Sequence, residues 1–509
     1  MGGAFTGQLS PDGRWRWDGT ALRSTATLTD LVSMPAWASI KLRAEATWPM
    51  LGAALLVGLM ADQSLRTGTF GLAATLAIAL MPLTLIFAGL SRSPSSRVLA
   101  LGGLAFAVWL TIRASPWLVW PDLAAALILL GLSGSFALRG SLADMGVAEA
   151  IARAVHAIAQ GSAGSAFIVK PLVRGRKHIS SAAPVARGLL IAAPIAVLLA
   201  LLLAAADPIF ASFFSVNVDF GQLTLDIIFV LAGSLLAAAL LRLASAEPLG
   251  RIDGPSWRLG ATEGLIVLAV LDAVFAAFAF AQVLGVTGAA GDTLRAAGVT
   301  YADYARSGFF ELLWVAGITA VVIIVFSRVT SLRSSRSRRS FIVLSEVGIG
   351  LTLLIVFVAF QRLSLYEEAF GFTMLRLYSH IFAVWIALVF VFLAADIGGV
   401  HRSRRWLVGA TVASATGILL MLNVANPEAI VVTLNVEHAS GAHKIDADYL
   451  AQLSSDAIPT LLASRSQLDP TLRSQVNVVA CAGSRSYSPQ LAAYNWADAG
   501  AAAARRAGC

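Results

Sequence analysis

Ionisable side chains inside strongly apolar stretches are the first residues of this sequence that could do chemistry. Asp272 lies near the middle of the apolar run 260–286, and Gln282 lies further along it in nearly the same helical direction. Glu346 lies about one turn inside the run 341–363. Ionisable groups in hydrocarbon usually face a bundle interior or a cavity. Asp272 is thus either a protonated carboxyl group bonded to a neighbouring helix or part of a proton or cation relay.

A second set of polar residues lies in or next to loops that we expect on the outer face of the membrane. Its members are Asp207, Tyr301, Tyr304, Arg306, Glu311, Arg362, Tyr366, Glu367, Glu368, Arg376 and His380. Arginine forks suit carboxylate and phosphate groups, so this set can bind a zwitterionic or phosphorylated substrate. It can equally be a buried ion-pair network that clamps the last four spans to the C-terminal segment. We favour the network, because perturbed charge clusters are often structural.

Sequence motifs of common enzymes are absent. There is no Walker A loop, no His-Glu-x-x-His, no Gly-x-Ser-x-Gly and no Cys-x-x-Cys. The six histidines have no metal-ligand spacing. A membrane-embedded hydrolase or transferase with Glu367 or Glu368 as its base is conceivable, but no nucleophile is indicated. We therefore expect no catalytic residue, no metal and no cofactor.

The composition places most of the chain in lipid. Charged residues make up 13% of the sequence and hydrophobic residues 58%, with a mean hydropathy of +0.78, whereas soluble domains carry roughly 25% charged residues. The net charge of +8 does not indicate nucleic-acid binding, because the basic residues stand between apolar runs, where they determine orientation.

The apolar runs predict an all-α polytopic membrane protein of about eleven transmembrane helices, since each crossing needs about 20 mostly apolar residues. The first and third runs are short, so ten or twelve spans remain possible. The runs are 47–63, 68–90, 97–112, 116–138, 188–211, 224–244, 260–286, 308–327, 341–363, 374–396 and 405–425.

Basic residues indicate the orientation, because Lys and Arg are retained on the cytoplasmic side. With the N-terminus inside, the inner segments carry 25 basic residues and the short outer loops carry 6. The first 46 residues lack the apolar core of a cleavable signal peptide. We therefore expect a multi-pass protein of the bacterial cytoplasmic membrane with its C-terminus outside.

Both cysteines, Cys481 and Cys509, fall in the tail that this topology places outside. An even pair confined to one extracytoplasmic segment predicts a disulfide that closes the tail. The alternative is two unrelated buried thiols.

Five regions follow from these patterns. A cytoplasmic tail at 1–46 contains a small hairpin in which Trp15 and Trp17 alternate after a Pro-Asp-Gly turn. The other regions are a four-helix membrane segment at 47–138, a cytoplasmic linker at 139–187, a second membrane domain at 188–425 and an extracytoplasmic helical domain at 426–509. In the last region we expect a helix that begins at Asn426-Pro427, a second helix around 446–462, and an Ala-rich helix beyond.

The linker contains a predicted amphipathic helix at 142–160. Its polar stripe consists of Glu149, Arg153, His156 and Gln160. The opposite apolar face consists of Met145, Ala148, Ile151, Val155 and Ile158. Several basic residues follow the helix, so the region 142–187 fits a segment on the inner leaflet beside anionic lipid. A plain positive-inside anchor explains the same residues, and we favour it. The bilayer is thus the expected partner; the sequence indicates no protein partner.

Several stretches together resemble a bacterial membrane family known as a domain of unknown function, the 4153/4173 group. They are Ala206-Asp-Pro208, Tyr301–Leu312, Leu365–Thr373, Leu375-Arg-Leu377, Asn426-Pro-Glu-Ala429 with Asn435, and Asp446-Ala-Asp-Tyr-Leu450 with Ser454, Asp456, Ala457 and Pro459. The N-terminus also resembles a short SPDGRWxWDGT module of bacterial membrane proteins, although Leu22 stands where a further Trp is usual. The resemblance implies a multi-span membrane domain without an established activity.

Two functions remain open. A transporter of a small charged solute would use Asp272 and the outer cluster along its path. A sensor or scaffold would have a closed bundle whose polar outer face is covered by the tail. We favour the second, because the sequence lacks the inverted repeat that transporters often carry.

Overall fold

The computed structural model describes residues 15–17, 22–24, 42–68, 70–174, 220–252, 258–286, 309–400, 405–440, 446–483 and 486–509. The predicted span 188–211 and the predicted site residues Asp207, Tyr301, Tyr304 and Arg306 lie outside these ranges. Near the N-terminus, β1 (Trp15–Trp17) and β2 (Leu22–Ser24) pair as an antiparallel hairpin, with Trp17 opposite Leu22.

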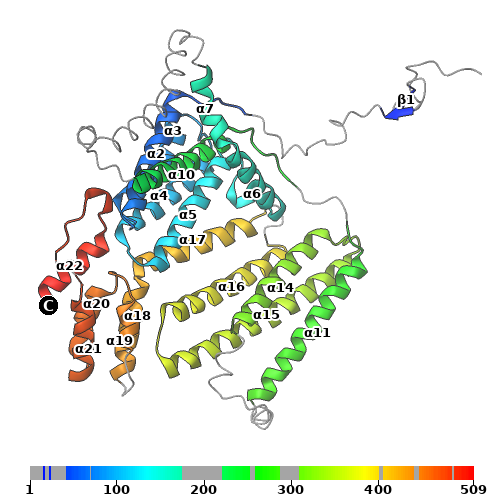
Figure 1. The fold of residues 1–509 in the computed structure, drawn as a ribbon. Coiled ribbons are helices and arrows are strands. Elements are labelled where there is room, and N and C mark those ends of the chain that lie inside the picture. The colour runs from blue at the N-terminus through cyan, green and yellow to red at the C-terminus, as the bar shows by residue number, and fades with distance from the viewer. Residues whose placement is uncertain are drawn as a thin grey trace, which may run out of the picture.

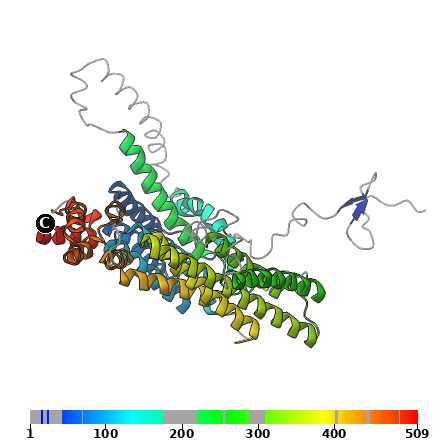
Figure 2. The same ribbon diagram turned by 90° about the horizontal axis from the view of Figure 1, so that it is seen from below.

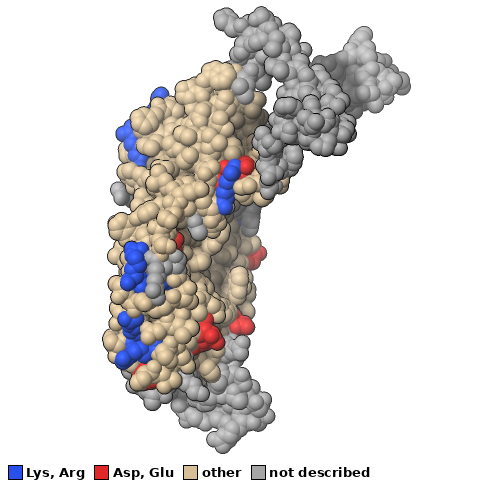
Figure 3. All heavy atoms as spheres, turned by 60° about the vertical axis from the view of Figure 1, so that its left-hand side comes forward, with Lys and Arg blue, Asp and Glu red and all other residues tan. Residues whose placement is uncertain are grey.

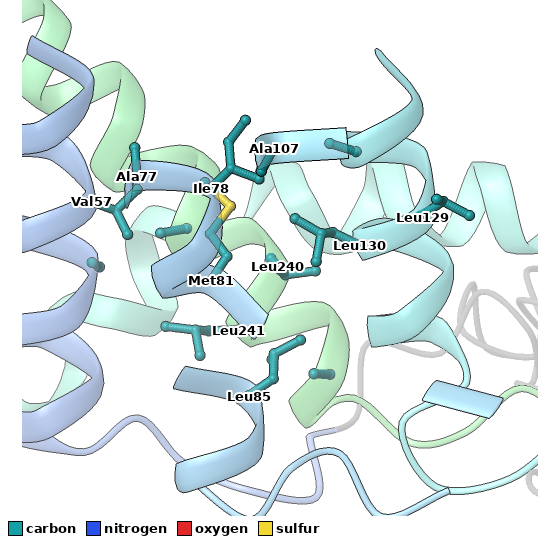
Figure 4. Packing of buried hydrophobic residues seen from close by; sticks show 14 of the residues in the cluster. Val57, Ala77, Ile78, Met81, Leu85, Ala107, Leu129, Leu130, Leu240 and Leu241 are labelled. Carbon is teal, nitrogen blue, oxygen red and sulfur yellow. The ribbon is translucent and has the colours of Figure 1, made fainter. Parts of the chain in front are cut away.

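Five long helices form a first bundle around one apolar core (Figure 1). They are α2 (Trp48–Arg66), α3 (Leu72–Phe87), α4 (Pro94–Ile112), α5 (Pro116–Ser135) and α10 (Phe220–Ser245). Proline stands in the first turn of α2, α4 and α5, where its missing N–H costs no helical hydrogen bond. Met81 and Leu85 of α3 share this core with Leu240 and Leu241 of α10 (Figure 4).

Glycines bring α2 and α10 into close contact. A Cβ atom on Gly58 would lie 2.3 Å from the carbonyl oxygen of Val230 and 2.2 Å from Oγ of Ser234. On the other helix, a Cβ on Gly233 would lie 2.7 Å from the Cβ of Ala61. Small residues that let two backbones approach are a common basis of helix packing in membranes.

We expect Gly58→Leu to destabilise the first bundle by about 3 kcal/mol or more, because the side chain would overlap a backbone carbonyl that cannot rotate away. The matched control is Gly52→Leu, since Gly52 is on the same helix and a Cβ there would have nothing within 4 Å. Thermal unfolding in nanodiscs measures both. Equal unfolding temperatures for the two variants would contradict the close packing of α2 on α10.

A second bundle contains α11 (Ala261–Val286), α14 (Phe309–Val329), α15 (Ser335–Phe370) and α16 (Met374–Gly398). Its core includes Leu268, Ile323 and Phe390. The helix α17 (Leu407–Ala425) runs between the bundles in Figure 1 and contacts both α5 and α16. It thus joins the two halves of the membrane domain.

The chain is a polytopic membrane protein. Eight described helices, α4, α5, α10, α11 and α14 to α17, are long and apolar enough to cross a bilayer. Ten of the eleven predicted runs coincide with helices, although α3 has only 16 residues. Large apolar side chains such as Leu231, Ile266 and Trp314 are exposed, and charged residues occupy only small patches of the surface in Figure 3. Such an exterior suits contact with lipid.

The linker contains a 3₁₀ turn η2 (Leu142–Asp144), then α6 (Val147–Ser162) and α7 (Gly164–Arg174). The predicted polar stripe of α6 is buried: Arg153 bonds Glu149 at 2.8 Å and lies 4.1 Å from the ring of Phe136. The apolar face, with Ile151 and Ile158, points outward. This arrangement turns the apolar face of α6 toward its surroundings, as a helix in contact with lipid requires.

Five helices after α17 form a small domain, which we call the C-domain. They are α18 (Pro427–Ser440), α19 (Ala447–Ala451), α20 (Ile458–Ser464), α21 (Pro470–Cys481) and α22 (Trp496–Gly508), with 3₁₀ turns η4 (Arg465–Gln467) and η5 (Leu491–Ala493). Asn426 caps α18 as predicted, accepting a hydrogen bond from the Ala429 amide. The cysteine sulfurs of α21 and the chain end form a disulfide between Cys481 and Cys509.

The single helix predicted around 446–462 was wrong, because the chain forms α19 and α20 with a turn at 452–457 between them. Pro459 stands in the first turn of α20, and a proline in a helix interior would clash with the preceding turn. The turn also frees Asp456 for contacts outside the C-domain. The Ala-rich remainder contains two helices, α21 and α22, instead of one.

The described connections after α2, α4 and α15, which fall at the loops predicted on the outer side, lie at the C-domain (Figures 1 and 2). Connections predicted on the inner side meet one another at the far end. There the Arg92 amide donates to Ala137 O at 2.7 Å, and the Arg405 amide donates to Asp144 Oδ1 at 3.0 Å. The helices therefore alternate in direction as the sequence predicted.

Candidate functional site

One contact between the C-domain and the first bundle is made by the buried carboxylate of Asp456. Asp456 accepts hydrogen bonds from the amides of Ala114 and Ser115 at 2.7 and 2.8 Å, and its other oxygen lies 3.1 Å from the Arg113 guanidinium. Arg113 also donates to the carbonyl of Asn423 at 2.8 Å. Asp456 is almost wholly buried. The short connection between α4 and α5 is thus held by a charge-assisted network, which is stronger than neutral hydrogen bonds.

Further polar side chains support this contact from both sides. Asn423, near the end of α17, donates to Asp122 of α5 at 2.6 Å, and Asn426 donates to the carbonyl of Asp456 at 3.0 Å. Glu428 accepts two hydrogen bonds from Ser454, at 2.7 and 2.8 Å. Burial raises the pKa of Glu428 above its usual range, although the bonds from Ser454 act in the opposite sense.

The second bundle meets the C-domain at the connection between α15 and α16. Asn435 of α18 accepts from the Phe372 amide at 3.0 Å and donates to the Phe372 carbonyl at 2.8 Å. The Tyr449 hydroxyl accepts from the Met374 amide at 2.6 Å. The C-domain therefore bridges the ends of both bundles.

A cavity of about 640 Å³ lies between the C-domain and the first bundle. Small-molecule sites usually have roughly 300–1,000 Å³. The bundle contributes Phe70, Ala114, Pro116, Val119 and Trp120, among others, to its wall. The C-domain contributes Leu450, Ala451, Ser454, Ile458, Asp498 and Arg505, among others. The rings of Phe70 and Trp120 meet edge to face at 5.2 Å, so one wall is aromatic.

Asn495, at the start of α22, fixes this helix against the bundle. Its side-chain amide donates to the carbonyls of Phe70, Leu110 and Arg113 at 2.9 to 3.2 Å. Its oxygen caps α22 by accepting from the Ala497 amide at 2.9 Å. Because α22 is anchored here, its Asp498 and Arg505 side chains are held over the cavity.

Four described members of the predicted outer cluster form two pairs at the end of α15 and the start of α16. His380 Nδ1 lies 3.3 Å from Glu367 Oε1, and the Arg376 guanidinium lies 4.3 Å from the ring of Tyr366. Arg362 donates to Gln282 at 3.2 Å. These contacts lie near the connection between α15 and α16, whereas Glu311 and Glu368 are exposed and take no part in them among the described residues.

The predicted membrane site does not come together as one cluster. Asp272 is buried between α11 and α15, where a Cβ on Gly348 would lie 2.7 Å from its Oδ1. Neither carboxylate oxygen of Asp272 has a hydrogen-bond partner among the described residues. Glu346 is half-buried and faces Gly398 of α16. Gln282 belongs instead to the contact with Arg362.

Sequence reasoning missed the residues that line or lock the cavity: Arg113, Asp122, Asp456, Asn495, Asp498 and Arg505. Asp456 was part of the quoted family pattern, and Arg113 was the single basic residue of its short loop. These two signals could have pointed to the docking contact. The α22 residues stand in an Ala-rich stretch without any motif, so only the fold reveals them.

Comparisons with known proteins identify one family. A model described as a domain of unknown function (DUF4153) matches residues 98–463. The match extends from α4 to α20 and leaves out α2 and α3 of the first bundle. No curated protein and no solved structure matches the chain.

Proposed function

The chain belongs to the DUF4153 family, whose description gives no activity, and from the cavity we propose that this protein is a membrane-embedded sensor of a small ligand. The ligand binds in the cavity between the C-domain and the first bundle. The observation that carries the proposal is the composition of the cavity wall, since both parts contribute to it.

In this proposal the C-domain faces the outside of the bacterial cytoplasmic membrane. The excess of basic residues in the connections at the far end supports this orientation, because Lys and Arg are retained inside. The disulfide between Cys481 and Cys509 also supports it, since such bonds persist in oxidising compartments.

A ligand in a shared cavity contacts two parts that are joined mainly by polar contacts. It therefore shifts the population of docked and undocked C-domain by its difference in affinity for the two states. The contact at Asp456 connects the cavity wall to α5 and, through Asn423, to α17, which joins the bundles. A change in docking can thus reach both halves of the membrane domain.

The proposal is tested by filling the cavity. Ala451 lines the cavity and is exposed, so Ala451→Trp should occupy it without disturbing the core of the C-domain. Ala503→Trp, on the exposed face of α22, is the control. We expect small molecules that co-purify with the wild-type protein in nanodiscs, detected by mass spectrometry, to be retained by the control and lost from Ala451→Trp. Equal retention by both variants would contradict the proposal.

A second candidate is transport of a cation or proton, which the unpartnered carboxylate of Asp272 favours. Both oxygens are buried without a hydrogen bond in the described part of the chain, and Oδ1 faces Gly348, a costly arrangement inside a membrane. Uptake into proteoliposomes would then be abolished by Asp272→Asn and unaffected by Ala451→Trp. Uptake that is unchanged in Asp272→Asn would rule out this candidate.

A further inference from the structure

The helix α22 contributes one acidic and one basic side chain to the cavity wall. Asp498 and Arg505 both line it and both belong to α22. They are seven residues apart, which places them on the same helical face about 10 Å from each other along the axis. Within the described part of the chain neither has an ion-pair partner, and they do not pair with each other.

Each charge is held by a neighbour and keeps atoms free for a ligand. Arg505 Nε donates to the Ala480 carbonyl at 2.8 Å, which fixes the guanidinium against Gly483 and leaves its two terminal nitrogens without a protein acceptor among the described residues. Asp498 accepts a short hydrogen bond, 2.5 Å long, from the Ser455 hydroxyl through Oδ1. Its second oxygen accepts no hydrogen bond from the described residues.

The geometry points to a zwitterionic ligand whose acid group binds Arg505 and whose amine binds Asp498, with the length of a short peptide. An extended chain of three residues spans roughly 10 Å, which matches the rise along the α22 axis between the two residues. The guanidinium fork suits a carboxylate, and the aromatic wall of Phe70 and Trp120 provides apolar surface for the body of the ligand. This inference rests on the proposed function, because it assigns a ligand class to the same cavity.

Asn495, a further polar side chain of this wall, is already used by the fold. Asn495 makes all its side-chain hydrogen bonds to the protein. It therefore positions α22 and has no part in recognising the ligand.

The test uses three probes that differ at their ends: trialanine, N-acetyl-trialanine, which lacks the amine, and trialanine amide, which lacks the acid. Binding to the full-length protein in nanodiscs is measured by titration calorimetry for the wild type, Arg505→Gln and Asp498→Asn. The control is Arg506→Gln, which removes the same charge from the neighbouring position outside the cavity wall.

We expect trialanine to bind the wild type and the control, and to bind each of the two cavity variants about tenfold more weakly. The amide should be insensitive to Arg505→Gln, and the acetylated peptide should be insensitive to Asp498→Asn. A merely structural role for either residue would weaken all probes alike and lower the unfolding temperature without peptide.

The inference is overturned if trialanine does not bind the wild type, or if both cavity variants bind it as the wild type does. These results differ from a failure of the proposed function itself. If Ala451→Trp still releases a co-purified molecule, the cavity is a binding site and only the ligand class is wrong. If Ala451→Trp changes nothing either, the proposed function fails too.

Discussion

Replacing Asp456 with alanine is expected to release the C-domain from the membrane helices at a cost of about 3–5 kcal/mol, because breaking a buried ion pair leaves the other charge without compensation. Arg113 would remain mostly buried, and the amides of Ala114 and Ser115 would lose their acceptor. Hydrogen exchange followed by mass spectrometry measures this directly, as faster exchange over residues 113–115.

Asp469→Ala is the matched control for this prediction. Asp469 also accepts hydrogen bonds from two backbone amides, those of Thr471 and Leu472, but it is exposed and caps α21 inside the C-domain. Its loss should cost about 1 kcal/mol and leave exchange at 113–115 unchanged. If the amides of residues 113–115 exchange as slowly in Asp456→Ala as in Asp469→Ala, the docking contact is not held by Asp456.

Removing the disulfide is the second change with a large expected effect. The bond between Cys481 and Cys509 links positions 28 residues apart, and the chain-entropy model gives about 3–4 kcal/mol for a loop of this length. The variant with serine at both positions should therefore unfold its C-domain at a lower temperature. Because α22 carries Asp498 and Arg505, the variant should also lose ligand affinity.

The reducing agent dithiothreitol provides the control for the disulfide. It should lower the unfolding temperature of the wild-type C-domain to that of the double-serine variant and should leave the variant itself unchanged. Two free thiols in protein isolated with a rapid alkylation step would contradict the bond and the compartment that it implies.

The sequence was most informative where hydrophobicity alone decides the structure. Runs such as 260–286 and 374–396 predicted α11 and α16 almost to the residue, because a bilayer-spanning segment has to satisfy its backbone within one helix. The capping pair Asn426-Pro427 predicted the start of α18 for an equally local reason. The distribution of basic residues among the loops also predicted that successive connections lie at opposite ends of the helices.

The candidate cavity was beyond such rules. Its charged residues, Asp498 and Arg505, stand in a run of alanines, and the contact of Asp456 with Ala114 joins positions more than 300 residues apart. Nothing in the spacing of either segment indicates its partner. The sequence predicted that α6 has a polar face, but it did not predict that this face is buried. The burial of Arg153 depends on its contacts with Phe136 and Ser135. Tertiary contacts of this kind have no periodic signal.

In the proposed orientation, the cavity between the C-domain and the first bundle faces the outside of the cell. The most direct test is labelling of Ala451→Cys in intact cells with a membrane-impermeant thiol reagent, with Ser335→Cys at the far end as the comparison. Both positions are exposed, and the native cysteines are bonded to each other. We predict labelling of Ala451→Cys in intact cells and of Ser335→Cys only after lysis. The reverse pattern would place the cavity inside the cell and contradict the proposed orientation of the C-domain.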